Sequence, residues 1–441
     1  MIRFLKKAHL SLLFVLAAQA HGQTEMTAEE AVRLGLKKNF DIQIARNNAK
    51  IAENNAGLGT ANFLPSLDAS GGYSFNQSDQ ETNSPFSFGA SDTKTLNGQL
   101  SLNWTLFDGF RMFVDNKRFQ ALAKLGEFQA RSLIENTVVG VLQAYFNVVQ
   151  QEQLTEVVRN SRAVSEARLE KEKVRNEIGG ASSTDLLNAQ VAYNADAAAL
   201  INQELQLEIA RKELNIALGR DPQTPISVKK EIEVEPFSLP LNELLTRAEE
   251  RNSELLAALQ NRKIAEQDVK IARSAFFPQL SFNAAYGRSD RTTSSESEQF
   301  PEDITTNSTD KSVGLTLSFN LFNGFRNRID LQNARIEAEN QQLALDDFKN
   351  RLAGVIAETF VTFRKQMELV RLEEDNVVAA RQNLQLQQDR YQIGASSSIE
   401  FRDAQVSLNR AQTTLISARF QARLTRAEME RLTGGLKINQ N

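Results

Sequence analysis

A strand-to-helix junction occurs twice in this chain and constrains its fold more than any other feature of the sequence. "LSLNWTLFDGFRMF" begins at Leu100, and "LTLSFNLFNGFRNR" begins at Leu315. In each copy apolar and polar residues alternate, an Asp-Gly or Asn-Gly step follows, and a charged stretch with helical spacing begins. A second pair, "EIGGASSTDLLNAQ" from Glu177 and "QIGASSSIEFRDAQ" from Gln392, keeps the same offset. The chain is therefore an internal duplication.

Each half is predicted to run in the order helix, strand, loop, strand, very long helix, turn, helix. The first helix of the chain is expected over residues 27–61 with a break near Asn39. Alternation predicts strands of about ten residues, a length that crosses hydrocarbon when tilted. They lie near residues 67–76, 96–106, 280–286 and 313–321, and long polar hairpin loops cover 77–93 and 289–311.

The helical periodicity continues much further than in a globular domain. Long helices are expected over residues 110–177 and 325–391, and return helices over 182–218 and 397–432. At 1.5 Å per residue the longer ones would extend on the order of 100 Å. Such lengths favour a tube or a rod. At the junctions, Gly109 and Gly324 are expected to turn the backbone, and Asp108 and Asn323 to cap the new helices.

Composition excludes several classes of function. The 441 residues carry a net charge of -4, so no basic surplus is available to bind a polyanion. Cysteine is absent, and the two histidines, His9 and His21, lie in or beside an expected leader. No constellation of nucleophile, base and oxyanion donor can be assembled. We therefore expect no enzyme activity, no metal site and no cofactor.

The N-terminus is predicted to be a secretory signal peptide, with a basic start, a short apolar core and an Ala-Gln-Ala cleavage site. No later apolar run is long enough for a membrane-spanning helix. The expected organisation is a signal peptide over residues 1–20, a first repeat over 21–218, a connecting segment over 219–239, a second repeat over 240–433 and a tail over 434–441.

The strands admit two architectures. One is a sandwich in water with a single dry face, and the other is a membrane barrel, which export and the length of the strands favour. In lipid a sheet must close on itself, and four strands are too few to do so. Several copies would therefore have to share one barrel, eight strands from two copies or twelve from three.

The duplicated plan, the "LFDGF" and "LFNGF" junctions and the tips "IGGASSTDLL" and "IGASSSIEFR" together resemble the TolC-like outer-membrane efflux proteins over nearly the whole mature chain. The resemblance implies a mixed α+β, mostly α fold. In it, a long antiparallel α-helical barrel, or coiled-coil tunnel, crosses the periplasm and joins a shared transmembrane β-barrel with four strands per chain. It also implies a homotrimer in the outer membrane that works with a periplasmic adaptor and an inner-membrane pump. Phe40 and Ser253 stand where the family often has proline.

The two tips contain the candidate functional residues. Their residue types alone predict helix stops and starts, with Asp185 and Glu400 favouring the helix N-termini. The resemblance further implies that Glu400 and Asp403 form acidic rings at a periplasmic constriction, with Asp185 and Tyr391 in its closing network. Ser396 stands where one relative has an arginine, which puts an identical salt-bridge lock in doubt. The expected adaptor contacts are Gly179, Gly180, Ser182, Ser183, Gly394, Ser396 and Ser397.

Two functions remain. The first is the outer-membrane channel-tunnel of a tripartite efflux or type I secretion system, a passive duct with no nucleic-acid partner. The alternative is an exported coiled-coil fibre, structural or adhesive, without channel activity. The sequence does not specify the transported substrate, the pump or the adaptor.

Overall fold

The computed structural model describes residues 25–79, 90–180, 182–295 and 302–436. The expected signal peptide, residues 1–20, lies outside these ranges, as do the centres of both hairpin loops. The chain divides into two compact units. The first unit contains the described residues 25–38, 140–180, 182–234 and 368–423, and the second unit contains the other described residues.

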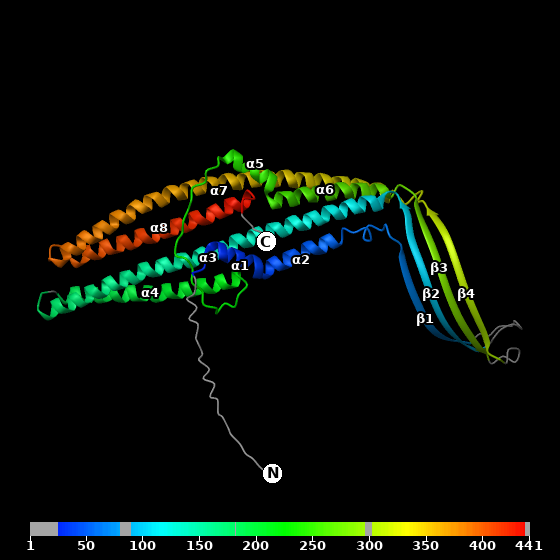
Figure 1. Cartoon of the computed structure of the whole chain (residues 1–441), viewed down its shortest axis with the longest axis horizontal. Coiled ribbons are helices and arrows are strands. Elements are labelled where there is room, and N and C mark those ends of the chain that lie inside the picture. Colours follow the sequence, from blue (N-terminus) through cyan, green and yellow to red (C-terminus); the bar gives the residue numbers. More distant parts are fainter. Residues whose placement is uncertain (1–24, 80–89, 181, 296–301, 437–441) are drawn as a thin grey trace, which may run out of the picture. The chain divides into compact units, whose positions relative to one another are not determined.

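The elements follow one another in the same order in both halves of the chain (Figure 1). The first half contains α1 Ala28–Lys38, α2 Phe40–Asn54, β1 Ser66–Ser78, β2 Ser91–Asp108, α3 Arg111–Glu177 and α4 Ser183–Ala217. The second contains α5 Leu241–Arg251, α6 Ser253–Ser274, β3 Gln279–Ser295, β4 Ile304–Ser318, α7 Arg326–Gln392 and α8 Ser398–Leu432. The long helices α3 and α7 have 67 residues each.

An asparagine divides the first helical segment of each half. The Asn39 side chain accepts hydrogen bonds from the amides of Asp41 and Ile42, at 2.9 and 3.3 Å, and so starts α2. Asn252 caps α6 by accepting from the Leu255 amide at 2.8 Å. Capping by a polar side chain interrupts a helix without proline. The first segment ends earlier than expected, because α2 stops at Asn54 and residues 55–61 form turns.

The four strands form one antiparallel sheet in the order β1-β2-β3-β4. The register places Leu67 opposite Leu102, Leu102 opposite Ala284, and Ala284 opposite Val313, so one face of the sheet is apolar. Alternate positions such as Asp68 and Ser101 share the polar face. In the described part of the chain, β1 and β4 are the edges of this sheet.

The expected strand length of about ten residues is wrong. The strands have 13, 18, 17 and 15 residues, and they extend into segments expected to be hairpin loops. The added residues are rich in threonine, which favours extended backbone. They continue the ladder through pairs such as Thr93 with Thr293 and Arg291 with Thr306. β4 ends at Ser318, so Phe319 and Leu321, expected on this strand, lie beyond it.

Each unit has a core of its own. In the second unit, side chains from α5, α6, α7 and α8 form one apolar cluster: Leu244, Ala248, Leu255, Leu345, Leu352, Ile356, Met429 and Leu432. In the first unit, the buried Tyr145 donates its hydroxyl to the carbonyl oxygen of Met26 at 2.9 Å. Burial raises the pKa of Tyr145 to about 12. This tyrosine therefore remains a neutral donor that holds the N-terminal segment to α3.

None of the helices in the described ranges carries an apolar stretch that is long enough to cross a bilayer.

Candidate functional site

The two strand-to-helix junctions share a left-handed backbone. Gly109 and Gly324 have φ of +69° and +68°, and the phenylalanines after them, Phe110 and Phe325, have φ of +68° and +63°. A Cβ on Gly109 would lie 2.5 Å from the Ser274 carbonyl oxygen, whereas a Cβ on Gly324 would meet open space. Gly109 is therefore required by both conformation and packing, and Gly324 by conformation alone.

The expected capping residues at the junctions differ in what they bind. Both carboxylate oxygens of Asp108 accept from the Met112 amide, at 3.1 and 3.0 Å, so Asp108 does cap α3. Asn323 instead donates its amide to the Asn327 side chain at 2.7 Å. Asn327 in turn donates to the Ala275 carbonyl at 3.0 Å. The second junction therefore uses a side-chain relay where the first uses a cap.

The two helix tips are built alike. Just beyond the end of α3, Gly179 has φ of +76°, and the Gly180 amide donates to the Arg175 carbonyl at 2.7 Å. The second tip repeats this arrangement with Gly394, φ +79°, and with the Ala395 amide donating to the Arg390 carbonyl at 2.8 Å. These bonds define a Schellman stop, which needs a residue in the left-handed region.

Each tip then starts its return helix with a capping box. Asp185 exchanges hydrogen bonds with Ser182 through both backbone amides. Glu400 does the same with Ser397 and also accepts from the Ser396 hydroxyl at 2.8 Å. Hydrogen bonds from the Ser397 amide and the Ser396 and Ser397 hydroxyls hold the pKa of Glu400 below its ordinary value. Within one chain, both acidic residues therefore stabilise helix starts.

The remaining candidate residues occupy different environments. The exposed tips of the turns carry Gly179, Gly180, Ser182, Ser183, Gly394 and Ser397, while Ser396 is partly buried. Asp403 is exposed, one helical turn beyond Glu400 on α8. Tyr391 is buried, and its hydroxyl donates to the Glu172 carboxylate rather than to Asp185. Within one chain, Tyr391 is therefore joined by its hydroxyl to Glu172 of α3, and its expected place in a closing network with Asp185 stays a prediction.

Several contacts fix the Tyr391 side chain. Its ring stacks on Phe401, with the centroids 5.3 Å apart and the planes 1° from parallel. The Lys171 ammonium lies 4.1 Å from the ring centroid, a cation–π contact. Burial and the bond to Glu172 raise the pKa of Tyr391 to about 12. Tyr391 therefore links α7 to α3 as a neutral donor over the physiological pH range.

Near the tips, α3, α4 and α8 share a buried polar cluster that was not predicted from the sequence. Arg402 of α8 makes a two-pronged ion pair with Asp196 of α4, at 2.6 and 2.8 Å. Ser161 and Ser165 of α3 also donate to the Asp196 carboxylate. Gln405 of α8 donates to the Ser161 carbonyl at 2.8 Å. Three helices are therefore joined by hydrogen bonds where a helical bundle normally has apolar contacts.

The charge of Asp196 follows from this cluster. Burial alone raises the pKa of a carboxyl group. Here the hydrogen bonds from Arg402, Ser165 and Ser161, with the charge of Arg402, outweigh burial and lower the pKa of Asp196. On α3 the same face continues to the buried Arg168 and Glu172. Burial lowers the pKa of Arg168, whose Nε and Nη1 atoms have no hydrogen-bond partner among the described residues.

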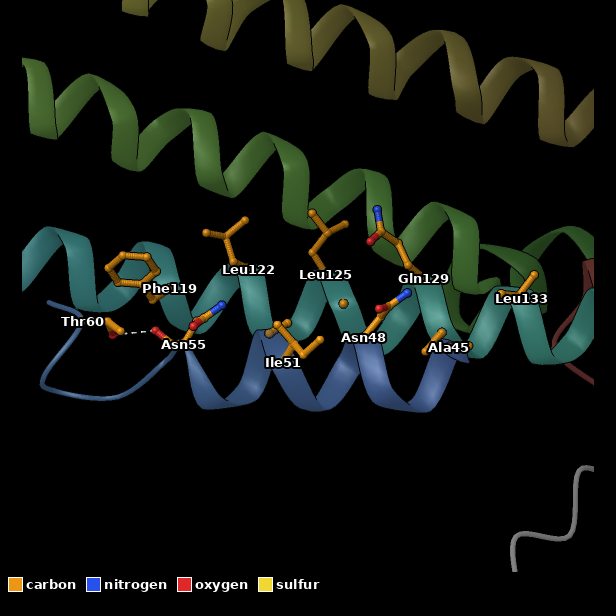
Figure 2. Close-up of a pocket in the computed structure, with 13 residues that line it drawn as sticks. Ala45, Asn48, Ile51, Asn55, Thr60, Phe119, Leu122, Leu125, Gln129 and Leu133 are labelled. Carbon is orange, nitrogen blue, oxygen red and sulfur yellow. Dashed lines mark hydrogen bonds between the residues drawn. The ribbon is translucent and has the colours of Figure 1, made fainter. Parts of the chain in front are cut away.

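An open cavity of about 620 Å³ lies between α2 and α3 in the second unit (Figure 2). Figure 2 shows residues of both helices along the cavity, among them Asn48 and Ile51 on α2 and Leu122 and Leu125 on α3. None of the described residues that line the cavity is titratable, so these residues offer no acid or base. In the described ranges, no three His, Cys, Asp or Glu side chains gather as metal ligands.

The similarity of this chain to known proteins extends over both repeats. A family model described as outer membrane efflux protein matches residues 31–220 and 244–435. The chain is 23% identical over 315 residues to the outer membrane protein TolC of Escherichia coli K12. This match covers 69% of this chain and 62% of that protein. It is 25% identical over 407 residues to the alkaline protease secretion protein AprF of Pseudomonas aeruginosa, covering 89% and 82%.

A solved structure has the same fold. The Campylobacter jejuni CmeC outer membrane channel superimposes with a TM-score of 0.77 at 16% identity, over 92% of this chain and 85% of that one. This likeness confirms the expected mixed fold, mostly helical, with a four-stranded antiparallel sheet in each chain.

Proposed function

Since the chain belongs to the outer membrane efflux protein family, we propose that it is the outer-membrane duct of a tripartite efflux or type I secretion system. The observation that carries this proposal is the match of the family model to both repeats. In each repeat the two strands are followed by a helix of 67 residues. The duct is passive. Substrates enter from an inner-membrane pump and leave at the cell exterior.

The sheet supports assembly from several copies. β1 and β4 are its edges, and lipid offers no partner for their backbone groups. The β4 edge of one copy pairs with the β1 edge of the next. Three copies supply twelve strands and leave room for a pore, whereas a small barrel of about eight is filled by side chains. We therefore favour a homotrimer over a dimer.

The relatives point to two kinds of cargo. One is named for alkaline protease secretion in Pseudomonas aeruginosa, and another is named as the outer membrane protein of an antibiotic efflux pump in Pseudomonas putida. A wide aqueous duct has little binding specificity of its own, so the pump selects the cargo. The adaptor meets the two tips, at Gly179, Gly180, Ser182 and Ser183 of the first and Gly394, Ser396 and Ser397 of the second.

The tips also close the duct in this proposal. Glu400 and Asp403 lie three residues apart on α8 and share one face of the helix. Three copies of this face form two acidic rings that attract cations. Within each copy, the Tyr391–Glu172 bond and the Asp196–Arg402 pair hold α7 and α8 against α3 and α4. The first tip contributes through the capping box of Asp185.

No enzyme activity is part of this function. The family is one of passive channels, and the cavity between α2 and α3 offers no acid or base. We propose that the protein catalyses no reaction and needs no cofactor.

Conductance in planar bilayers tests the gate. The Glu400→Ala, Asp403→Ala double variant should lose cation selectivity, measured as the reversal potential in a KCl gradient, and should conduct more. Glu249→Ala with Glu250→Ala removes the same charge from α5 and should leave both quantities unchanged. Unchanged selectivity in the Glu400 and Asp403 variant would refute the acidic rings.

The alternative function is an exported coiled-coil fibre. It accounts for the long helices but gives the apolar face of the sheet no role. Extraction separates the two functions. A duct leaves the membrane fraction only with detergent, and a fibre leaves it with salt or chelator alone.

A further inference from the structure

The apolar face of the sheet ends at a different register on each strand. Counted from the strand-to-helix junctions, its last apolar residues are Phe75 on β1, Leu96 on β2, Tyr286 on β3 and Val313 on β4. Phe75 pairs with Lys94, which is two residues nearer the hairpin loop than Leu96. Leu96 pairs with Asp290, which is four residues nearer the hairpin loop than Tyr286. Tyr286 in turn pairs with Lys311, which is two residues nearer the hairpin loop than Val313. The boundary therefore recedes toward the junctions at every strand from β1 to β4.

Such a slanted boundary is what tilted strands require. Strands of a membrane barrel cross the bilayer at about 35–45° to its normal, so a level lipid surface cuts successive strands at successive registers. The four boundary residues consequently lie at one height when the strands are tilted in this sense. That height is on the hairpin side, opposite the helices, and therefore on the exterior side of the outer membrane.

The next residue on this face is a cation on three of the four strands. Lys94 follows Leu96, Arg288 follows Tyr286, and Lys311 follows Val313, each two positions further. All three are exposed. On β1 the equivalent residue is the neutral Gln77.

Contacts hold two of these cations near the boundary. The Lys311 ammonium lies 5.7 Å from the centre of the Tyr286 ring, and Arg288 pairs with Asp290 at 3.2 Å. Asp290 and Asp92 lie one step further toward the hairpins than Arg288 and Lys94. On these strands the cation is therefore nearest to the apolar band, and the acid comes after it.

We propose that Lys94, Arg288 and Lys311 form a cationic rim that binds the phosphate groups of anionic lipids in the outer leaflet. The rim rests on the membrane-spanning barrel proposed above. Basic side chains attract an anionic lipid surface, and a guanidinium can bind phosphate oxygens in pairs. Tyr286 marks the same height, because tyrosine favours the boundary between acyl chains and headgroups. An acid in the first position would repel the phosphates, and none of the four strands has one there.

Spin-labelled lipids test the rim on the full-length protein in phosphatidylcholine vesicles. Spin-labelled phosphatidic acid should be immobilised at the protein surface in preference to spin-labelled phosphatidylcholine. Each charge removed by Lys94→Gln, Arg288→Gln or Lys311→Gln should lower the preference by up to about fivefold per site. The preference should also fall between 0.1 and 1 M NaCl, as the Debye length shrinks from about 10 to about 3 Å.

Arg291→Gln is the matched control. Arg291 lies on β3 three residues from Arg288, so it points to the opposite, luminal face. This variant should keep the full preference. Equal loss in the control, or no preference in the natural protein, would overturn the proposal. So would displacement of the labelled lipid by millimolar inorganic phosphate, since that would indicate a site for the free ion.

The single tryptophan separates failure of the rim from failure of the barrel. Trp104 lies on the apolar face of β2, opposite Phe282. Brominated acyl chains should quench its fluorescence whatever the lipid headgroup. Quenching without headgroup preference refutes the rim alone, whereas absence of quenching refutes the membrane-spanning sheet. If a variant that carries Lys94→Gln, Arg288→Gln and Lys311→Gln together does not insert, the three single variants and the salt series decide.

Discussion

At the scale of single residues, the two halves of the chain reach the same geometry by different means. Asp108 caps α3 directly, while Asn323 acts through Asn327. The ion pair of Asp196 and Arg402 joins α4 of the first half to α8 of the second. The Asp196 side chain is 11% exposed, so its charge is stabilised chiefly by the groups that contact it.

Removing that charge should loosen α8. In Asp196→Asn, Arg402 keeps its charge without a carboxylate partner, which should cost about 2 kcal/mol or more. Hydrogen–deuterium exchange across α8 should then accelerate. Glu204→Gln is the control, because Glu204 lies on the same helix and its pair with Arg159 leaves both side chains at least half exposed. Equal exchange in both variants would show that the cluster does not hold the helices.

The pH dependence of the same pair has a definite sign. The pKa of Asp196 is lowered by folding, so its contribution is present above the ordinary value of 3.8 and is lost as pH falls below it. Exchange protection of α8 from this pair should therefore be constant between pH 8 and pH 5, once intrinsic exchange rates are corrected. A loss of protection already at pH 6 would contradict this assignment.

The junction glycines should differ in their tolerance of alanine. Gly324→Ala should cost about 1–2 kcal/mol, since a Cβ meets only the penalty of the left-handed backbone. Gly109→Ala should cost roughly 2–4 kcal/mol, because the Cβ also approaches the Ser274 carbonyl and the Phe277 side chain. Thermal unfolding in detergent measures both variants. Equal destabilisation would show that the first junction relaxes freely.

At the scale of elements, periodicity predicted the order of helices and strands well. The long helices begin and end within a residue or so of the positions expected, because glycine stops and serine caps mark their ends. The strand lengths were underestimated, because residues such as Thr93 and Thr305 have no apolar partner to reveal them as strand. These residues are extended because they pair with neighbouring strands in the sheet, and not because apolar and polar residues alternate locally.

The polar cluster was missed for a different physical reason. Ser161, Ser165, Arg168 and Glu172 follow the 4, 3, 4 spacing of an inward stripe, but each is polar, and polar residues at helical spacing are ordinarily solvent-exposed. Asp196, which accepts from Ser161 and Ser165, lies 206 positions from its ion-pair partner Arg402 in the chain. A stripe of polar residues that continues an apolar one was the available signal. Only tertiary structure shows which helices it joins.

At the scale of the whole molecule, the sheet is the part that one chain cannot complete. Its apolar face suits lipid, and its two edge strands need partners. In the proposed function, the tips and the polar cluster affect how the duct closes, and the proposed cationic rim affects how the barrel sits in the membrane. The proposed acidic rings and cationic rim depend on several copies sharing one barrel.

Native mass spectrometry of the detergent-purified protein tests that central claim most directly. The account predicts a complex of three chains that persists at nanomolar concentration and dissociates only when the sheet is denatured. A stable dimer would contradict the twelve-stranded barrel. A monomer that remains soluble without detergent would contradict the duct itself.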